Sequence, residues 1–237
     1  AAVNNNGHAL QYALPGAKND REIVLAAVKN KSSSLLYASP QLQNDRNFIL
    51  DAVSRNGFVI QYLSPEFRKD REIILPAIYK FNITLINVPQ ELRGDPEIVL
   101  TLVNKRGIDL KYASPDLKNN RKIVLAGVTQ NGMALQYASP GLQNDREIVL
   151  AAIKNNIDAL EYASPELQND REIVMAAVTR NVYTLKYASP ELQNDRDFIL
   201  DVVTQNGLAL QFASSNLKNN REIVMAAVNN IGYALQF

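Results

Sequence analysis

The heptapeptide Asn144-Asp145-Arg146-Glu147-Ile148-Val149-Leu150 decides the fold of this chain, because it returns at a fixed spacing. It recurs with conservative changes at residues 169–175 and 194–200, each 25 residues after the copy before it. The same frame extends in both directions without an insertion and divides the 237 residues into nine full repeats and a half repeat of 12. Such a period predicts a stack in which each repeat contacts mainly its neighbours.

The sequence of one repeat predicts helices. Ser139-Pro140 ends one helix and begins the next, because Pro disfavours the helical conformation in the residue before it and is favoured in a first turn. Asp145 is a suitable N-cap for a helix from Arg146 to about residue 156, whose apolar side chains fall on one face. The glycine that follows in most repeats, as at Gly132 and Gly207, predicts a helix C-cap. A second, shorter helix is predicted over residues 158–163.

The alternative is a leucine-rich repeat, whose period is also near 25 and in which Ile-Val-Leu-Ala-Ala-Val would be a buried strand. Its pattern L-x-x-L-x-L is absent, and the paired alanines between Asp and Gly favour a helix. Two apolar columns are expected to form the core between repeats. They are Leu10, Leu35, Ile60, Leu85, Leu110, Leu135, Leu160, Leu185, Leu210 and Leu235, and Val3, Val28, Val53, Ile78, Val103, Val128, Ile153, Val178, Val203 and Val228.

The sequence therefore predicts an all-α fold, an elongated α-solenoid of about nine and a half 25-residue helical-pair repeats. We expect residues 1–237 to form a single continuous helical repeat array. Neither end carries a polar cap, which predicts that the chain is part of a longer array.

The recurring stretch D-R-E-I-V-L-A-A-V-x-x-N-G-x-A-L-x-Y-A-S-P resembles the tandem repeats of domain-of-unknown-function family 4116. The resemblance covers essentially the whole chain and is strongest over residues 101–237. It implies a repeat protein. It implies no catalytic or ligand-binding residue, because the family has no assigned activity.

The composition argues against most enzymatic chemistry. The chain has no Cys and one His, His8, so thiol nucleophiles, disulfides and the usual zinc sites are excluded. Carboxylate pairs recur in every repeat, whereas an active site is singular. We expect no catalytic, cofactor-binding or metal-binding residue, no cofactor, and a protein that is not an enzyme. No apolar run reaches 18 residues, so we expect no membrane insertion, and no signal peptide is apparent; the localisation is left open.

Two polar columns have both a structural and a functional interpretation. The tyrosines could pack between repeats with the hydroxyl at the edge, which is favoured, or could stack bases or grip a polyproline peptide. The arginines at the long-helix starts are predicted to bridge acids of adjacent repeats; the alternative is a row that binds phosphate or carboxylate groups. The columns are Tyr12, Tyr37, Tyr62, Tyr112, Tyr137, Tyr162 and Tyr187, continued by Phe212 and Phe237, and Arg21, Arg46, Arg71, Arg121, Arg146, Arg171, Arg196 and Arg221.

A third set is a stripe of cations without acids at the end of the long helix and in the turn after it. Cations suit a helix C-terminus, and they could also bind an acidic partner. One repeat, residues 76–100, breaks the pattern: Pro76 predicts a kink, and Tyr79 and Phe81 replace polar residues, which indicates either a tolerated irregularity or a docking site. The candidate partner-binding residues are Lys29, Lys31, Arg55, Lys80, Lys105, Arg106, Lys154 and Arg180, with Tyr79 and Phe81.

The preferred functional hypothesis is a non-enzymatic repeat scaffold that binds a protein or peptide along an extended surface. A structural module that stacks head to tail into a larger array or filament through its uncapped ends is the first alternative. Weak binding of acidic polymers or nucleic acid through the basic stripe is the second, and a net charge of +1 makes nucleic acid a disfavoured partner.

Overall fold

The computed structural model describes residues 7–237, so Val3, the first member of the valine column, lies outside the described residues. The chain divides into two compact bodies, and each is described by itself. The N-terminal body comprises Ala1–Leu102 with Tyr112–Ser114, and the C-terminal body comprises Val103–Lys111 with Pro115–Phe237. The single continuous array over residues 1–237 stays a prediction.

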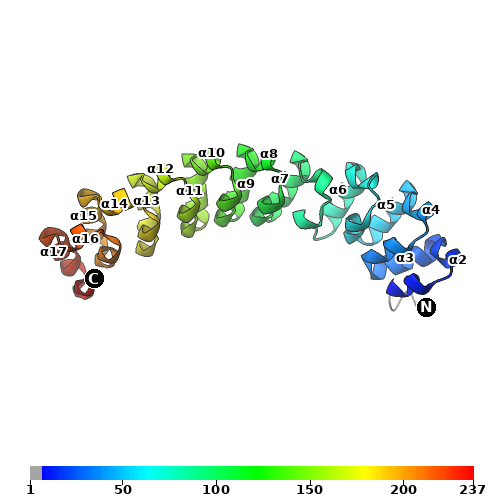
Figure 1. The fold of residues 1–237 in the computed structure, drawn as a ribbon, viewed down its shortest axis with the longest axis horizontal. Coiled ribbons are helices and arrows are strands. Elements are labelled where there is room, and N and C mark those ends of the chain that lie inside the picture. Colours follow the sequence, from blue (N-terminus) through cyan, green and yellow to red (C-terminus); the bar gives the residue numbers. More distant parts are fainter. Residues whose placement is uncertain (1–6) are drawn as a thin grey trace. The chain divides into compact units, whose positions relative to one another are not determined.

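Every described repeat is built from helices, and no strand occurs in residues 7–237 (Figure 1). The prediction of an all-α repeat fold is therefore confirmed. The helices up to the second body are η1 Gly7–Tyr12, α2 Pro15–Lys18, α3 Arg21–Asn30, η2 Ser32–Tyr37, α4 Pro40–Gln43, α5 Arg46–Arg55, η3 Gly57–Tyr62, η4 Phe67–Lys69, α6 Arg71–Lys80, η5 Leu85–Asn87, η6 Gln90–Leu92 and α7 Pro96–Lys105, where η denotes a 3-10 helix.

The remaining helices repeat a three-part order of 3-10 helix, one-turn α-helix and long α-helix. They are η7 Gly107–Tyr112, α8 Pro115–Lys118, α9 Arg121–Gln130, η8 Gly132–Tyr137, α10 Pro140–Gln143, α11 Arg146–Asn155, η9 Ile157–Tyr162, α12 Pro165–Gln168, α13 Arg171–Val178, η10 Val182–Tyr187, α14 Pro190–Gln193, α15 Arg196–Gln205, η11 Gly207–Phe212, α16 Ser215–Lys218, α17 Arg221–Asn230 and η12 Gly232–Gln236. The predicted second helix is thus a 3-10 helix, and the short turn before the long helix is itself helical.

Short polar side chains begin each of the three helices. Ser164 accepts a hydrogen bond from Leu167 N–H and starts α12, with Pro165 as its first residue. Asp145 accepts from the N–H groups of Glu147 and Ile148 and starts α11, as predicted. Asn156 accepts from Asp158 N–H and starts η9. The same asparagine cap is observed at five of the described 3-10 helices, and it was not predicted from the sequence.

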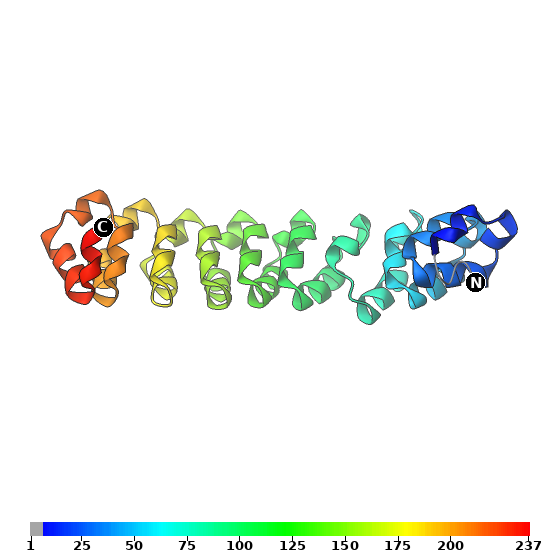
Figure 2. The ribbon, with the colours of Figure 1, turned by 90° about the horizontal axis from the view of Figure 1, so that it is seen from below.

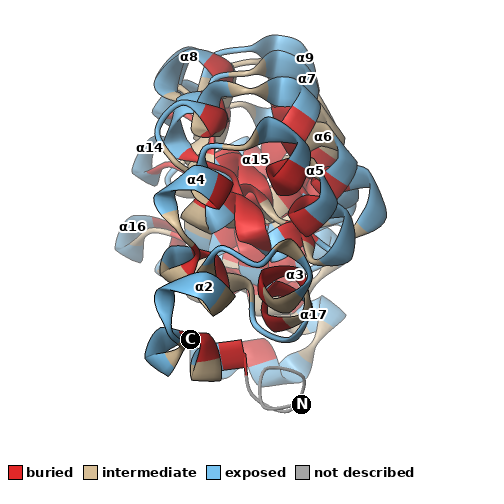
Figure 3. Ribbon diagram, turned by 90° about the vertical axis from the view of Figure 1, so that its right-hand side faces the viewer, coloured by how far each residue is buried: buried red, intermediate tan, exposed pale blue. Residues whose placement is uncertain are grey.

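The core runs between successive long helices and 3-10 helices, where most members of the predicted apolar columns lie. In the last repeat the prediction was wrong for Leu235 of η12, which is 72% exposed, and Val228 is half-buried. In α11 the side chains of Ile148, Val149, Ala152 and Ile153 are buried, and Leu160 of η9 is 0% exposed. Within the C-terminal body α9 and α11 lie side by side in both ribbon views (Figures 1 and 2). The long helices such as α5 carry buried segments, whereas one-turn helices such as α4 are mostly exposed (Figure 3).

The glycine after the long helix is not the predicted C-cap. No described residue has a positive φ, and Gly132 is the first residue of η8. The C-cap of α9 is Asn131 in an extended conformation. Glycine is required because a Cβ on Gly132 would lie 2.4 Å from the carbonyl oxygen of Ala152 in the next repeat. The glycine column therefore records close packing between repeats, and the C-cap prediction was wrong.

A serine–asparagine ladder joins successive one-turn helices. In five repeats a Ser Oγ donates to an Asn Oδ1 of the preceding repeat at 2.6 Å, and the backbone N–H of the same Ser donates to a carbonyl beside that Asn. The pairs are Ser39–Asn19, Ser139–Asn119, Ser164–Asn144, Ser189–Asn169 and Ser214–Asn194. The ladder explains why a Ser before a one-turn helix recurs together with an Asn in the preceding repeat. The sequence predicted only the helix-capping role of the Ser.

The arginine column forms the predicted ladder of ion pairs between repeats. Arg71 lies 2.8 Å from Asp95 and 2.5 Å from Glu97, and Arg121 lies 2.8 Å from Asp145 and also pairs with Glu147. Corresponding pairs are Arg21–Asp45, Arg46–Asp70, Arg46–Glu72, Arg146–Asp170, Arg146–Glu172, Arg171–Asp195 and Arg196–Glu222. These guanidinium groups are already paired with carboxylates, which disfavours the phosphate-binding alternative for them.

The repeat containing Pro76 is irregular, and the kink predicted at Pro76 stays a prediction. Helix α6 continues through Pro76 and has ten residues, as α11 has, so the helix is not interrupted there. The irregularity follows it: the six-residue 3-10 helix of other repeats is reduced to η5, and the one-turn α-helix is replaced by η6.

Across residues 7–237 no helix combines the length and apolar character that crossing a bilayer would require.

Candidate functional site

The predicted cationic stripe lies on what we call the helix-end edge, the last turn of each long helix and the first turn of the 3-10 helix after it. Its eight cations are all exposed. Tyr79 is 61% exposed, and Phe81 is half-buried. The structure therefore places the candidate residues at the surface of their respective bodies, and the repeats of α9, α15 and α17 carry none of them.

Several of these cations also hold the repeats together. Lys80 Nζ donates to Ser54 O at 2.6 Å, and Arg180 Nη1 donates to the carbonyls of Ile153 and Lys154 at 2.6 and 3.2 Å. The acceptors are unpaired carbonyls at the C-terminus of the preceding long helix. Asn155 and Asn230 make the same contact with Thr129 O and Thr204 O, both at 3.0 Å. The predicted helix-terminus role is thus observed for two of the cations.

Phe81, a candidate docking residue, has a packing role. A Cβ on Gly57 would lie 2.5 Å from the Phe81 ring, so the ring packs directly on the glycine backbone. Lys80 Nζ lies 5.5 Å from the centre of the same ring. Two ion pairs of the stripe are long: Arg55–Glu22 is 3.9 Å and Arg106–Asp109 is 3.8 Å. Of the irregular repeat, Tyr79 is the aromatic residue that projects most into solvent.

Most tyrosine side chains of the column are partly buried and partly exposed to solvent. Tyr137, Tyr162 and Tyr187 are all half-buried, consistent with rings between repeats and hydroxyls at the edge. Burial raises the pKa of Tyr162, with further contributions from Glu161, Tyr187 and Tyr137. Tyr12 differs, with 84% of its surface exposed.

Two consecutive repeats of the C-terminal body lack the packing glycine. Ile157 and Val182 stand where Gly107, Gly132 and Gly207 approach a carbonyl of the next long helix. Beyond Ile157, helix α13 ends two residues early, at Val178, and Arg180 N–H bonds to Ala177 O in a tightened last turn. Beyond Val182, helices α13 and α15 approach each other less closely than any other neighbouring pair of long helices in this body.

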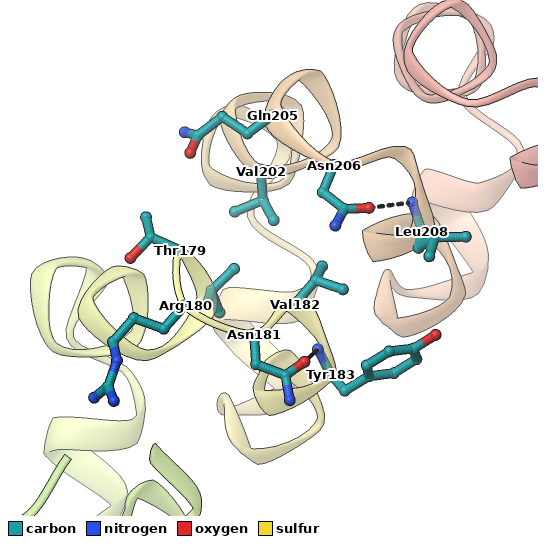
Figure 4. A pocket seen from close by; sticks show the side chains of 10 residues that line it. Thr179, Arg180, Asn181, Val182, Tyr183, Val202, Gln205, Asn206 and Leu208 are labelled. Atoms are coloured by element: carbon teal, nitrogen blue, oxygen red, sulfur yellow. Dashed lines mark hydrogen bonds between the residues drawn. The ribbon is translucent and has the colours of Figure 1, made fainter. Parts of the chain in front are cut away.

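A cavity of about 390 Å³ opens at this loosened junction on the helix-end edge (Figure 4). Its apolar surface comes from Val178, Val182, Val202 and Leu208, and Tyr183, which is 50% exposed, lies at its rim. The polar lining is Thr179, Arg180, Asn181, Gln205 and Asn206. The Arg180 side chain extends away from the cavity toward the preceding repeat, in agreement with its carbonyl contacts.

The two asparagines of the cavity have fixed orientations. Asn181 Oδ1 accepts from Tyr183 N–H, and Asn206 Oδ1 accepts from Leu208 N–H, both at 3.0 Å. Each Nδ2 group is left as a donor, and within residues 7–237 neither has an acceptor. Neither asparagine was predicted as a site residue, although the break in the glycine column at positions 157 and 182 is visible in the sequence at this junction.

Comparison with known proteins agrees with the repeat architecture. The family model described as Domain of unknown function (DUF4116) matches the chain five times in tandem, at residues 1–43, 45–93, 95–143, 145–193 and 195–237. Each complete match spans two of the 25-residue repeats, and together the matches cover nearly the whole sequence. No curated protein and no solved structure matches the chain.

Proposed function

Because this chain belongs to the DUF4116 family, whose description assigns no activity, we propose from its geometry that it is a non-enzymatic scaffold that binds a segment of a partner protein along the helix-end edge. The proposal rests on a surface position at which the backbone conformation is the same in several repeats while the side chain differs. Phe58, Met133, Asp158 and Tyr183 occupy the same second position of a six-residue 3-10 helix behind the same asparagine cap. Such positions can change chemistry without changing the fold.

Other surfaces are committed to contacts between repeats. The long-helix starts hold the arginine ladder, and the one-turn helices hold the serine–asparagine ladder. The last turn of each long helix carries no carboxylate, from Lys29 to Arg180, so an acidic or neutral segment would be tolerated there better than a basic one. No cofactor or reaction is part of this proposal.

The test is selection of ligands from a displayed library of random twelve-residue peptides by the full chain. We expect binders to emerge, and we expect Lys154→Glu to weaken their binding by about three- to tenfold, as reversal of a rim charge does. The matched control is Lys122→Glu, the same charge change at an exposed long-helix start. Failure to select any binder, or equal loss from both variants, would overturn the proposal.

The two alternatives stay predictions with their own measurements. Head-to-tail stacking predicts a particle mass that rises with concentration in light scattering. Binding of acidic polymers through the stripe predicts an oligonucleotide affinity that falls steeply with salt.

A further inference from the structure

We propose that the junction between α13 and α15 is a hinge in the C-terminal body. It opens at the helix-end edge and pivots where the one-turn helices α12 and α14 are bonded to each other. The motion belongs to this chain alone, so it goes beyond the proposed function and needs no partner. The contacts between the two repeats support it, because they are reduced at the helix-end edge and intact at the pivot.

The long helices on either side of this junction pack loosely. Helices α9 and α11 lie close together, as do α15 and α17, whereas α13 and α15 make few contacts. Val182 stands in the place of the packing glycine, and Val202 stands in the place of the alanine whose carbonyl that glycine faces. At the next junction, a Cβ on Gly207 would lie 2.3 Å from Ala227 O. The junction at Val182 therefore lacks the backbone contact that closes the junction after it.

A side-chain clamp that joins the ends of neighbouring long helices is also altered here. Asn155 Nδ2 donates to Thr129 O at 3.0 Å, and Asn155 Oδ1 accepts from Gly132 N–H at 2.7 Å. Asn230 makes both equivalent bonds at the junction between α15 and α17. At the junction between α13 and α15 the equivalent residue is Gln205, whose exposed side chain makes no hydrogen bond within residues 7–237.

Two cavities lie along this junction. Helix α13 ends at Val178, and the cavity of about 390 Å³ opens between its end and that of α15 (Figure 4). A second cavity, of about 410 Å³, lies between earlier turns of the same two helices, where Met175, Ala176 and Phe198 line it. Because protein interiors are otherwise close-packed, two cavities along one junction leave little contact to resist separation of the helices.

The opposite edge of the same junction is held by hydrogen bonds. Ser189 Oγ donates to Asn169 Oδ1 at 2.6 Å, and Ser189 N–H donates to Gln168 O at 2.9 Å, as in the other repeats of the serine–asparagine ladder. Arg171 at the start of α13 lies 2.5 Å from Asp195, the cap of α15. The two repeats are therefore fastened at their one-turn helices and long-helix starts.

This distribution of contacts defines the motion. Ala188 and Ser189 form an extended link between η10 and α14, and hinges absorb their motion in a few residues at the ends of elements. Because α15 and α17 pack closely on each other, they move as one unit against α9, α11 and α13. The distance between the ends of α13 and α15 changes, while the distance between α12 and α14 stays fixed.

Pairs of spin labels on the full chain test the hinge, and the absence of cysteine from the sequence leaves the introduced thiols as the only ones. Thr179→Cys with Thr204→Cys spans the junction at the helix-end edge, and Glu166→Cys with Glu191→Cys spans it at the pivot; all four side chains are exposed. Pulsed electron resonance should give a distance distribution about twice as broad for the first pair as for the second.

A third pair, Thr204→Cys with Asn229→Cys, is the control at the same edge of the closed junction between α15 and α17. It should be as narrow as the pivot pair. Equal widths for all three pairs would overturn the hinge. A single narrow distance for the Thr179–Thr204 pair would overturn it as well, because the junction would then be open but rigid.

Two substitutions return the residues of the closed junctions, and they separate the hinge from general looseness. Val182→Gly restores the packing glycine, and Gln205→Asn restores the clamp. Together they should narrow the Thr179–Thr204 distribution to that of the control pair, while circular dichroism stays helical. Gln130→Asn, the same exchange at the exposed equivalent position of α9, should leave that distribution unchanged. A distribution that stays broad in the restored chain would overturn the proposal.

A reverse exchange gives an answer even where the restored chain fails to fold. Asn230→Gln changes one exposed side chain and removes the clamp from the closed junction between α15 and α17. It should broaden the Thr204–Asn229 distribution. An unchanged distribution would contradict the role of the clamp in closing a junction.

Discussion

At the residue scale, the acids that accept from the arginine ladder have perturbed ionisation. Arg121 donates to Asp145 and lowers the pKa of that carboxyl, aided by the backbone N–H groups of Ile148 and Glu147 and opposed by burial. For Asp195 the backbone N–H of Phe198 is the largest cause of the lowered pKa, and Arg171 is the next. The same carboxylates therefore serve two purposes: they cap one helix and accept from the arginine of the preceding repeat.

The first prediction concerns the acid sensitivity of this ladder. Because the pKa of Asp145 is lower in the folded chain than its ordinary value of about 3.9, the unfolded state binds more protons, and stability is lost as pH falls through the folded pKa. Arg121→Gln should raise the pKa of Asp145 and reduce this dependence. Carboxyl NMR titration of Asp145 is the measurement, and Lys122→Gln, which removes a neighbouring charge, is the control that should leave it unchanged.

The second prediction concerns a core residue. Leu160→Ala should lower the free energy of unfolding by about 2–5 kcal/mol, because the side chain is 0% exposed and its removal leaves a cavity between repeats. Leu150→Ala is the matched control in the same repeat, since Leu150 is 37% exposed and should cost much less. Urea denaturation measures both. Equal losses would mean that the two faces of the repeat are wrongly assigned.

At the element scale, the spacing between helices depends on where a Cβ can be accommodated. In three repeats a glycine packs against a backbone carbonyl of the next long helix: Gly107, Gly132 and Gly207. In two other repeats the same position is occupied by Ile157 and Val182. The first is followed by a shortened α13, and the second by the cavity. In this body the two departures from the glycine pattern therefore coincide with a change in the next long helix and with an open junction.

The third prediction follows from this contact. Gly132→Ala should destabilise the chain by about 1–3 kcal/mol, because the new Cβ would lie 2.4 Å from Ala152 O and the helix would have to shift. Gly141→Ala is the control, because no atom lies within 4 Å of a Cβ there and the residue is in helix α10. It should be neutral or stabilise by up to about 1 kcal/mol. Thermal unfolding of both variants decides; a neutral Gly132→Ala would contradict the account of the glycine column.

At the scale of the whole molecule, the same kinds of contact recur along the chain, so stability is expected to be a sum of repeat terms and neighbour terms. Arg46, Arg121 and Arg146 each pair with acids of the next repeat only. Individually such exposed pairs contribute about 0–1 kcal/mol, and their value is to fix the register of successive repeats. The apolar columns supply most of the free energy.

The fourth prediction tests this locality by hydrogen exchange. Leu160→Ala should reduce the protection of amides in α11 and α13, whose repeats pack on η9. Amides of α3 and α5 in the N-terminal body should keep their protection, because contacts in a repeat stack reach mainly to neighbours. Exchange measured by mass spectrometry on the intact chain provides both regions in one experiment. An equal loss of protection in both would show that the chain unfolds as one cooperative unit.

The all-α repeat architecture follows from the 25-residue period, because each repeat must bury its apolar face against its neighbours. The sequence placed the long helix, the Asp145 cap, the buried Leu160 column and the arginine pairs, all of which depend on local propensity or on equivalence between repeats. It also located the cationic stripe correctly at the helix ends.

The roles of the glycines and asparagines depend on how adjacent repeats pack against each other. The distance from Gly132 to Ala152 O depends on how closely adjacent repeats pack, and the local sequence allowed a C-cap equally well. The continuity of α6 through Pro76 and the 3-10 form of η9 likewise depend on neighbours that no local pattern describes. The cavity beside Asn181 and Asn206 arises from the fit between two repeats, which is why a sequence read one repeat at a time did not predict it.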